Sequence, residues 1–415
     1  YEISACLVGS EMCIRDRKII MKKIYLDQAS TSCPKAPGVA DAVFHYLSGH
    51  AVNINRGSYD TAFSVEEQIF DTREQLKQLF HFPDKSRNVI FTANVTASLN
   101  ILLKGLLRPG DHVLVSSMEH NAVMRPLVQL EKTGVSFDRI PCDSAGNMLL
   151  EQAENLLRPE TRLLVCLHGS NVCGTLMPIK AIGEFCHKHG ILFVLDTAQT
   201  AGVLPIDMES CHIDALAFTG HKGFRGPQGI GGFLIREALV SDMVPLLSGG
   251  TGSISHTEEI PDFMPDRFEP GTPNIPGILG LHAALSCTGQ ICSHENFRHE
   301  MKLTEHFIRG IQSMDPLGKH LRIIGRTDCP DTLETAVRCS VVSVLTPEID
   351  MADAAFQMDN TYGIMTRVGL HCAPSAHKTL GTYPQGTIRF SFGPENTLEE
   401  INTALKALEE IAGSC

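Results

Sequence analysis

The sequence predicts an α/β protein whose large domain has a mostly parallel sheet and whose smaller second domain is α+β. Two patterns carry this prediction. From about residue 61 to 240, amphipathic stretches alternate with short apolar runs, as in βαβ units, and after about residue 285 this alternation stops. The length of 415 residues also exceeds the size at which one hydrophobic core usually stops growing, so more than one domain is expected.

The elements of the large domain follow one another along the chain. Residues 64–80 carry apolar side chains near helical spacing, residues 88–92 form an apolar strand run, and residues 96–107 form a helix that a Pro-Gly pair ends. The same alternation predicts further strands and helices at residues 112–117, 122–134, 163–169, 179–190, 191–196, 215–220 and 231–235. Because the strand runs are almost wholly apolar, the sheet is expected to be covered on both faces.

The second domain mixes longer helices with separate strands. We expect helices at 295–313 and 350–360 and strands at 338–346 and 386–392. The last helix, within residues 396–413, begins with a capping box in which Thr397 and Glu400 are three residues apart. The stretch RVGLHCAP at 367–374 is too short and mixed for a core strand or helix.

The N-terminal segment is divided from the rest by a methionine. Met21 opens the stretch MKKIYLDQAST, which reads as a natural start, so residues 1–20 are interpreted as a non-native tail. Residues 21–35 are expected to join the small domain, residues 36–284 to form the large domain, and residues 285–415 to form the small domain.

Composition narrows the class of protein. The net charge of −12, without a long Lys/Arg cluster, argues against nucleic acid as a partner, and no apolar run is long enough to span a bilayer. The 14 cysteines have no short paired spacing, which favours reduced thiols in a cytoplasmic protein. Cys186, His187 and His189 lie close together, but they end a predicted helix, where histidines suit the helix dipole, so no metal site is predicted.

Polar residues gather directly after the predicted strands. Because ligands of doubly wound sheets bind beyond the carboxyl ends of the strands, these residues are expected to share one rim. They are Glu119, His120, His168, Asn171, Asp196, Gln199, Thr219, His221 and Lys222.

Two of these residues together suggest pyridoxal phosphate chemistry. A desolvated lysine such as Lys222 can form an imine with an aldehyde, although a lone strand-end lysine more often only extends to solvent. Asp196 on the same rim can keep a pyridine nitrogen protonated, which is what makes pyridoxal phosphate an electron sink. Thr96 begins a helix whose amides can bind a phosphate, or it is an ordinary N-cap.

An ordered set of motifs strengthens this interpretation. The motifs span residues 23–412 and read LDQAST, RGSYDTAFS, FTANVTASLN, MEHNAVMRP, HGSNVCGTLMPI, LDTAQTAG, FTGHKGFRGPQGIGGFLI, RFEPGTPN, RVGLHCAP and GTIRFSFG. In this order they resemble the cysteine desulfurase and selenocysteine lyase branch of the class V aminotransferases. The resemblance implies an aspartate aminotransferase-like (type I) fold, pyridoxal phosphate as cofactor and a homodimer.

The resemblance also implies roles for individual residues. Lys222 matches the lysine that binds the cofactor covalently, His120 stacks over the pyridine ring, and Asp196 pairs with its nitrogen. The remaining cofactor contacts are Gln199 at the ring hydroxyl and, at the phosphate, Thr96, Thr219, His221 and, from the partner subunit, Thr272. Asn171, Arg389 and Arg367 are assigned to the substrate, because a guanidinium can bind a carboxylate with two hydrogen bonds.

Cys372 becomes the one cysteine with a chemical task. The resemblance implies conversion of L-cysteine to L-alanine, with the sulfur taken as a persulfide on Cys372 and passed to iron–sulfur cluster assembly or another acceptor protein. Lys222, Cys372 and His120 are therefore the expected catalytic residues. The step needs a thiolate, and we expect the adjacent His371 and nearby Arg367 to lower the pKa of the thiol.

Three alternatives stay open from the sequence. The first is selenocysteine lyase activity, in which the thiol is dispensable. The second is another class V reaction, such as transamination or epimerisation of an amino acid. The third is a pyridoxal phosphate-binding regulatory scaffold without catalysis, against which the presence of Lys222, Asp196 and Cys372 speaks.

Overall fold

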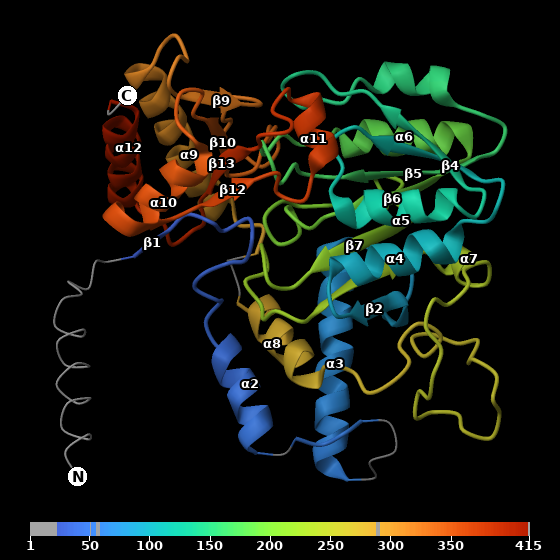
Figure 1. The fold of residues 1–415 in the computed structure, drawn as a ribbon. Helices are drawn as coiled ribbons and strands as arrows, with labels where there is room; N and C mark the ends of the chain where they lie inside the picture. Colours follow the sequence, from blue (N-terminus) through green and yellow to red (C-terminus); the bar gives the residue numbers. More distant parts are fainter. Residues whose placement is uncertain (1–22, 50, 55–58, 288–290, 414–415) are drawn as a thin grey trace, which may run out of the picture.

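The computed structural model describes residues 23–49, 51–54, 59–287 and 291–413 (Figure 1). The interpretation of residues 1–20 as a tail lies outside them. Two groups of strands, each with its own core, lie side by side, and the chain from residue 60 to 240 builds the larger group. No helix in this described part is long and apolar enough to cross a membrane.

A seven-stranded sheet forms the centre of the larger group. Its strand order is β2-β8-β7-β6-β5-β3-β4. The strands are β2 (Val89–Thr92), β3 (His112–Ser116), β4 (Ser136–Ile140), β5 (Thr161–Leu167), β6 (Leu192–Asp196), β7 (Ala215–Thr219) and β8 (Gly231–Ile235). Strands β4, β3, β5, β6 and β7 are parallel, which confirms the mostly parallel sheet, whereas β8 runs antiparallel to both its neighbours. The link from β7 to β8 contains no helix, and a parallel neighbour would need a longer crossover.

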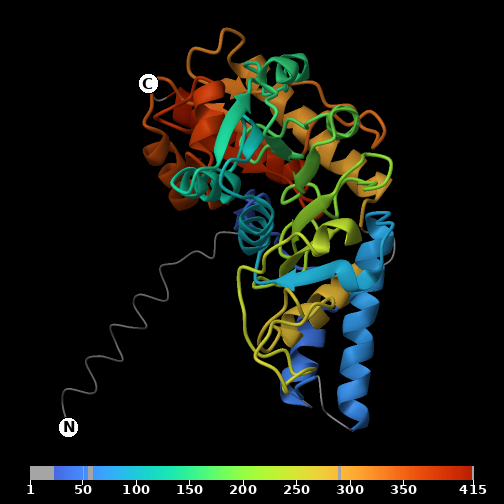
Figure 2. The same cartoon turned by 90° about the vertical axis from the view of Figure 1, so that its right-hand side faces the viewer.

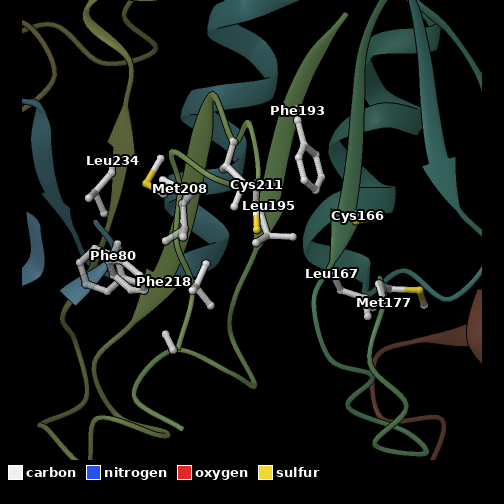
Figure 3. Close-up of a cluster of buried hydrophobic side chains, with 14 of the residues drawn as sticks. Phe80, Cys166, Leu167, Met177, Phe193, Leu195, Met208, Cys211, Phe218 and Leu234 are labelled. Atoms are coloured by element: carbon white, nitrogen blue, oxygen red, sulfur yellow. The ribbon is translucent and has the colours of Figure 1, made fainter. Parts of the chain in front are cut away.

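Helices cover both faces of this sheet. They are α3 (Asp60–Leu79), α4 (Val95–Leu106), α5 (Asn121–Glu131), α6 (Ile179–His189), α7 (Glu237–Val240) and α8 (Ile275–Leu285), with 3-10 turns η1 (Ser86–Asn88) and η2 (Leu150–Leu156). Helix α2 (Val39–Ser48) packs on α8 instead. Alternate strand residues enter two separate cores: Phe218 and Leu234 pack with Phe80 on one side (Figure 3), and Ala217 and Phe233 lie on the other. A sheet buried on both faces explains the apolar strand runs of the sequence.

The smaller group is built on an antiparallel sheet of order β12-β13-β10-β9. Its strands are β9 (Arg322–Ile324), β10 (Val341–Leu345), β12 (Arg367–Gly369) and β13 (Thr387–Ser391), and its helices are α9 (His294–Met314), α10 (Met351–Tyr362) and α12 (Leu398–Ala412). The short α11 (Pro374–Thr379) follows β12 in the chain but packs into the core of the larger group. The capping box of α12 is present as predicted, with Thr397 and Glu400 each bonding the other's backbone amide. A short β1 (Ile24–Tyr25) pairs with β11 (Ile364–Met365), so Ile24 and Leu26 lie in this core. The predicted limits at residues 35 and 284 stay predictions.

A buried arginine ties the two groups together. Arg338 is fully buried, and its Nη2 donates to the carbonyl of Val341 at 2.6 Å and to that of Cys173 at 3.5 Å. Thr175 also forms a β-bridge with Arg338. Because every donor of a buried guanidinium needs an acceptor, this contact fixes the loop after β5 against the small sheet.

Candidate active site

The polar residues after the parallel strands meet at one rim, as the sequence predicts. Asp196 is the last residue of β6 and Thr219 the last of the neighbouring β7, and Lys222 follows three residues later. Asn171 follows β5, and His120 lies between β3 and α5. Since β3, β5, β6 and β7 run in parallel, their carboxyl ends bring these side chains to the same edge of the sheet.

Asp196 is buried and Lys222 is partly buried at this rim. Burial lowers the pKa of Lys222 to about 8, and the Arg389 guanidinium acts in the same direction against the attraction of Asp196. Burial raises the pKa of Asp196, while the amide of Ala198, which donates to Oδ1 at 2.9 Å, opposes that rise. An amine with a lowered pKa is more often neutral near pH 8 and so more nucleophilic.

Several buried polar atoms at this rim have no hydrogen-bond partner among the described residues. They are Thr219 Oγ1, His221 Nδ1, Asn171 Oδ1 and the Nε of Arg389. Buried polar atoms are almost always paired in native proteins, so a group of orphans at one edge indicates a bound ligand. The hydroxyl of Thr219 and the imidazole of His221, beside Lys222 and Asp196, suit the phosphate of pyridoxal phosphate, and the guanidinium of Arg389 suits a carboxylate.

His120 is fixed as a neutral ring. It is the N-cap of α5, and its Nδ1 accepts a hydrogen bond from the amide of Ala122 at 3.0 Å. Burial, together with the charges of Lys222 and Arg125, lowers the pKa of His120 to about 4. A neutral imidazole with a fixed orientation can stack on a flat aromatic ring.

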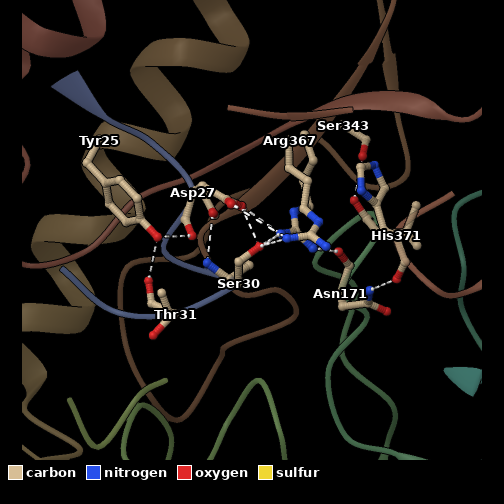
Figure 4. A network of polar contacts seen from close by, with 12 residues as sticks. Tyr25, Asp27, Ser30, Thr31, Asn171, Ser343, Arg367 and His371 are labelled. Carbon is tan, nitrogen blue, oxygen red and sulfur yellow. Dashed lines mark hydrogen bonds and ion pairs between the residues drawn. The ribbon is translucent and has the colours of Figure 1, made fainter. Parts of the chain in front are cut away.

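Arg389 bonds to three members of a polar network that contains Asp27, Ser30 and Asn171 (Figure 4). Its Nη2 donates to Asp27 Oδ1 and to Ser30 Oγ, both at 2.7 Å, and its Nη1 donates to the carbonyl of Asn171 at 3.0 Å. Arg367, opposite Arg389 in the β12–β13 register, donates to Ser30 Oγ at 3.0 Å. Of the three predicted substrate residues, Asn171 and Arg389 are in direct contact, and Arg367 shares Ser30 with Arg389. The roles of Asp27 and Ser30 were missed, although both lie in the quoted motif LDQAST.

Cys372 lies in a turn between β12 and α11 with its side chain exposed. Both His371 (φ 48) and Cys372 (φ 57) adopt the left-handed region that non-glycine residues rarely occupy. Two hydrogen bonds of 2.8 Å hold the turn: the amide of Asn121 donates to the carbonyl of Cys372, and Nδ2 of Asn171 donates to that of His371. Cys372 shares one pocket with Thr96, Asn100, His120, Asn121, Ala122, Arg125, Pro126 and Gln129.

His371 cannot act on the Cys372 thiol as a cation, which corrects the expectation from the sequence. Burial lowers the pKa of His371 to about 2, so the ring is neutral. Its Nε2 lies 3.0 Å from the hydroxyl of Thr387, which anchors the turn to β13. Arg367, the second predicted source of charge, is bonded to Ser30. His371 therefore acts on the shape of the turn.

Of the remaining predicted cofactor residues, Thr96 and Gln199 have defined surroundings in this chain, whereas Thr272 lies apart from the Cys372 pocket. Thr96 is in the first turn of α4 and lines the pocket of Cys372, and Gln199 donates from Nε2 to the carbonyl of Ala29 at 3.1 Å. Thr272 is exposed in the loop before α8 and is not among the residues that line this pocket. Its predicted role depends on a partner subunit.

Glu119 is a functional candidate to which the sequence assigned no role. Its side chain is fully buried, and its Oε1 accepts hydrogen bonds from the amide of Leu167, at 3.0 Å, and from the hydroxyl of Ser116. Burial raises the pKa of Glu119 to about 8. The carboxyl group thus joins the ends of β3 and β5, and His120 is the next residue in the chain.

The described residues contain no group of three or more His, Cys, Asp or Glu side chains that could hold a metal ion. Among Cys186, His187 and His189 at the end of α6, His189 pairs with a carboxylate: its Nε2 lies 3.1 Å from Glu154 Oε1.

Comparison with known proteins assigns the family. The model of the family described as Aminotransferase class-V matches residues 24–403. The chain belongs to the class V aminotransferases. Within this family, a "probable cysteine desulfurase" of Methanothermobacter thermautotrophicus is 32% identical over 96% of this chain and 97% of its own length. Another protein of that name, from Vibrio cholerae, is 31% identical over 93% of both chains.

Solved structures of cysteine desulfurases agree with the fold. The apo structure of a cysteine desulfurase from Thermococcus onnurineus NA1 has a TM-score of 0.84 and 31% identity, covering 95% of this chain and 96% of that one. A cysteine desulfurase from Escherichia coli has a TM-score of 0.79 and 27% identity, covering 94% and 95%. The predicted aspartate aminotransferase-like fold and the predicted family are therefore confirmed.

Proposed function

We propose that this protein is a pyridoxal phosphate-dependent cysteine desulfurase that converts L-cysteine to L-alanine and takes the sulfur as a persulfide on Cys372. One observation carries the role of Cys372: its turn is bonded to Asn121 and Asn171, and it shares a pocket with His120 and Thr96. The names of the relatives support the reaction.

The orphaned atoms of the rim support the cofactor. Lys222 would bind its aldehyde, Asp196 would pair with its ring nitrogen, and His120 would cover the ring. The further contacts would come from Thr96, Gln199, Thr219 and His221. Bound pyridoxal phosphate supplies a sink for the electrons left at Cα when a proton is removed.

The residues of the chain supply binding and proton transfer. Arg389, with its unpaired Nε, and Asn171 would hold the carboxylate group of the substrate. Lys222 Nζ would take the Cα proton. Cys372 Sγ would then attack the substrate sulfur, so that a sulfur–sulfur bond forms, the Cβ–S bond breaks with its electrons left on carbon, and that carbon takes a proton.

The test compares products and spectra. Wild-type holoenzyme with L-cysteine and dithiothreitol should form alanine and sulfide, and Lys222→Ala should lower the rate by about 10²–10⁴-fold. Cys372→Ala should lose alanine formation from L-cysteine. If that variant keeps the activity, the persulfide role is excluded, and activity on selenocysteine alone would identify a lyase. Protein that gains no absorption near the visible edge with pyridoxal phosphate would contradict the cofactor assignment.

We also propose a homodimer. On α3, Phe63 and Phe70 are 57% and 56% exposed, and Phe44 and Leu47 of α2 are exposed as well. Both helices extend together from one end of the molecule (Figures 1 and 2). An exposed apolar face of this kind marks an interaction surface. A partner would also supply Thr272 to the phosphate.

Transfer of the persulfide sulfur requires an acceptor, and Cys372 must be a reduced thiol before each turnover. We propose that a sulfur-acceptor protein, for iron–sulfur cluster assembly or another sulfur transfer, receives the sulfur. All eleven described cysteines are free thiols, which supports a cytoplasmic location.

A further inference from the structure

Beside the Cys372 pocket lies an open groove between α5 and α11, which we call the α5–α11 groove. It is lined by Ser117, Asn121, Met124, Arg125, Val128, Arg139, Pro374, Ser375, Lys378 and Thr379. Asn121 and Arg125 line both the groove and the pocket, so the two are continuous. The hydroxyl of Thr379 donates to the carbonyl of Ser117 at 3.1 Å, which fixes α11 against the end of β3.

The groove has a charge opposite to that of the whole chain. Three exposed cations, Arg125, Arg139 and Lys378, surround it, and no carboxylate lines either the groove or the pocket. In the part of the chain that the structure describes, none of the three forms an ion pair. The Arg139 guanidinium lies 4.9 Å from the centre of the Phe137 ring, and Lys378 Nζ lies 5.1 Å from that of Tyr383. In a chain of net charge −12, this is a local basic surface.

The lining also contains apolar surface. Val128 is 46% exposed, and Pro374 and Met124 lie beside it. A mixture of apolar side chains and a few cations suits a folded or extended acidic peptide better than a nucleic acid, which needs a longer series of cations to offset the negative charge of this chain.

We propose that the α5–α11 groove docks an acidic segment of the sulfur-acceptor protein and so brings its thiol to Cys372. This inference rests on the proposed function, because only a persulfide on Cys372 gives the docked thiol a reaction. The acceptor thiolate attacks the outer sulfur of the persulfide, the new sulfur–sulfur bond forms on the acceptor, and Cys372 leaves as a thiolate. Charge complementarity would raise the rate of encounter and select the partner.

The experiment uses wild-type holoenzyme with L-cysteine and two synthetic peptides of equal length. Each peptide has a single cysteine; the first also has four glutamates, and the second has four lysines. Alanine release and peptide persulfide are measured at several peptide concentrations. The glutamate peptide should reach half-maximal rate at a lower concentration, and this preference should shrink with added salt. Arg139→Glu and Lys378→Glu should each weaken the preference roughly threefold or more. Lys302→Glu, an exposed cation on α9, should leave it unchanged.

The outcomes separate this proposal from the proposed function. Absence of alanine with dithiothreitol as the acceptor would reject the function itself. Normal alanine formation without a glutamate preference, or with a preference that Arg139→Glu and Lys378→Glu leave intact, would overturn the docking groove. A change in oligomeric state in either variant would also overturn it, since a second copy of the chain would then cover the groove. Displacement of the glutamate peptide by an oligonucleotide of equal charge would overturn it as well. Unchanged melting temperatures exclude misfolding of the variants.

Discussion

Arg389 meets a carboxylate of its own chain. Only 3% of its side chain is exposed, and its Nη2 lies 2.7 Å from Asp27 Oδ1. A buried guanidinium without a partner is costly, so Asp27 keeps the cation in place. The positive charge also reaches the proposed catalytic amine, since Arg389 is the largest charge effect that lowers the pKa of Lys222.

The pH dependence of Lys222 tests this coupling. Because burial and Arg389 lower its pKa from 10.5 to about 8, the neutral amine accumulates as pH rises through 8. The rate at which apo protein captures pyridoxal phosphate should therefore rise with a midpoint near pH 8. Arg389→Gln removes a cation and should move the midpoint to higher pH, whereas Arg389→Lys should keep it. Stopped-flow absorbance measures the rate, and equal midpoints in the two variants would refute the coupling.

Glu119 gives a second prediction, on stability. Its pKa rises from 4.5 in an open chain to about 8 in the fold, so the unfolded chain loses this proton more readily. Its contribution to stability is complete below pH 4.5 and declines as pH rises toward 8, by at most about 1.4 kcal/mol per pH unit. Glu119→Gln keeps the shape without ionising. The melting temperature of the variant relative to wild type should thus increase from pH 5 to pH 8.

The control for this prediction is an exposed carboxylate. Glu151→Gln, at the start of η2, should show no such trend when the same melting curves are recorded. A difference between Glu119→Gln and wild type that stays constant with pH would mean that Glu119 is ionised in the folded protein.

The residues of the rim were predictable to different degrees. Asp196 and Lys222 could be placed together because parallel strands end at one edge, which requires only the order of the strands. Asp27, by contrast, reaches Arg389 across 362 positions of sequence, and no periodicity carries that pairing. The charge of His371 was misjudged because adjacency to Cys372 says nothing about burial.

At the scale of elements, Gly386 allows β12 and β13, which carry Arg367 and Arg389, to approach closely. Gly386 precedes β13 with φ 91, and a Cβ there would lie 2.4 Å from the backbone of Gly369 at the end of β12. The close approach lets β12 and β13 pair, which sets Arg367 opposite Arg389. Any side chain at this position would separate the strands.

Gly386→Ala should therefore weaken substrate binding. Gly381→Ala is the matched control, because its φ is 70 but its Cβ would meet nothing within 4 Å. Both variants bear the left-handed backbone cost of about 1–2 kcal/mol. Only Gly386→Ala should also raise the KM for L-cysteine, by roughly tenfold or about 1.4 kcal/mol. Steady-state kinetics measure KM, and melting curves measure stability. Equal KM values in the two variants would show that the contact between residue 386 and Gly369 does not affect substrate binding.

Long periodic elements were predictable, and short ones were not. Except for β4 and η2, which the sequence did not predict, the strands and helices from 88 to 235 lie within a few residues of their predicted positions, because burial imposes a period on long segments. β12 and α11 are too short to show a period, and they form because β13 and the Thr379–Ser117 contact hold them. RVGLHCAP therefore contains an edge strand and a turn, in agreement with the expectation that it is no core element.

At the scale of the whole molecule, the site needs parts from both strand groups. Lys222 and Asp196 come from the large sheet, whereas Arg389 and Cys372 come from the small group, and the buried Arg338 fixes the loop that carries Asn171 between them. Thr272 is the exception. It belongs to the large group but lies in an exposed loop outside the Cys372 pocket. A second copy of the chain can resolve this mismatch.

Mixing Lys222→Ala with Thr272→Ala tests whether Thr272 acts across the dimer. Lys222→Ala lacks the amine, and Thr272→Ala is expected to bind pyridoxal phosphate weakly. If Thr272 serves the neighbouring subunit, a mixed dimer contains one site with both residues intact, because each site combines Lys222 of one chain with Thr272 of the other. Co-refolded equal mixtures should then recover about one quarter of the wild-type activity under limiting cofactor, since half of the dimers are mixed.

The activity of the mixture shows whether Thr272 serves its own subunit or the neighbouring one. If Thr272 acted within its own chain, the mixed dimer would hold one site without Lys222 and one without Thr272, and no activity would return. Phe63→Asp on the exposed face of α3 should shift the protein toward monomer in light scattering and should abolish the recovery. Recovery that persists in the monomeric variant would contradict a site shared between subunits, because a monomer can offer Lys222 only the Thr272 of its own chain.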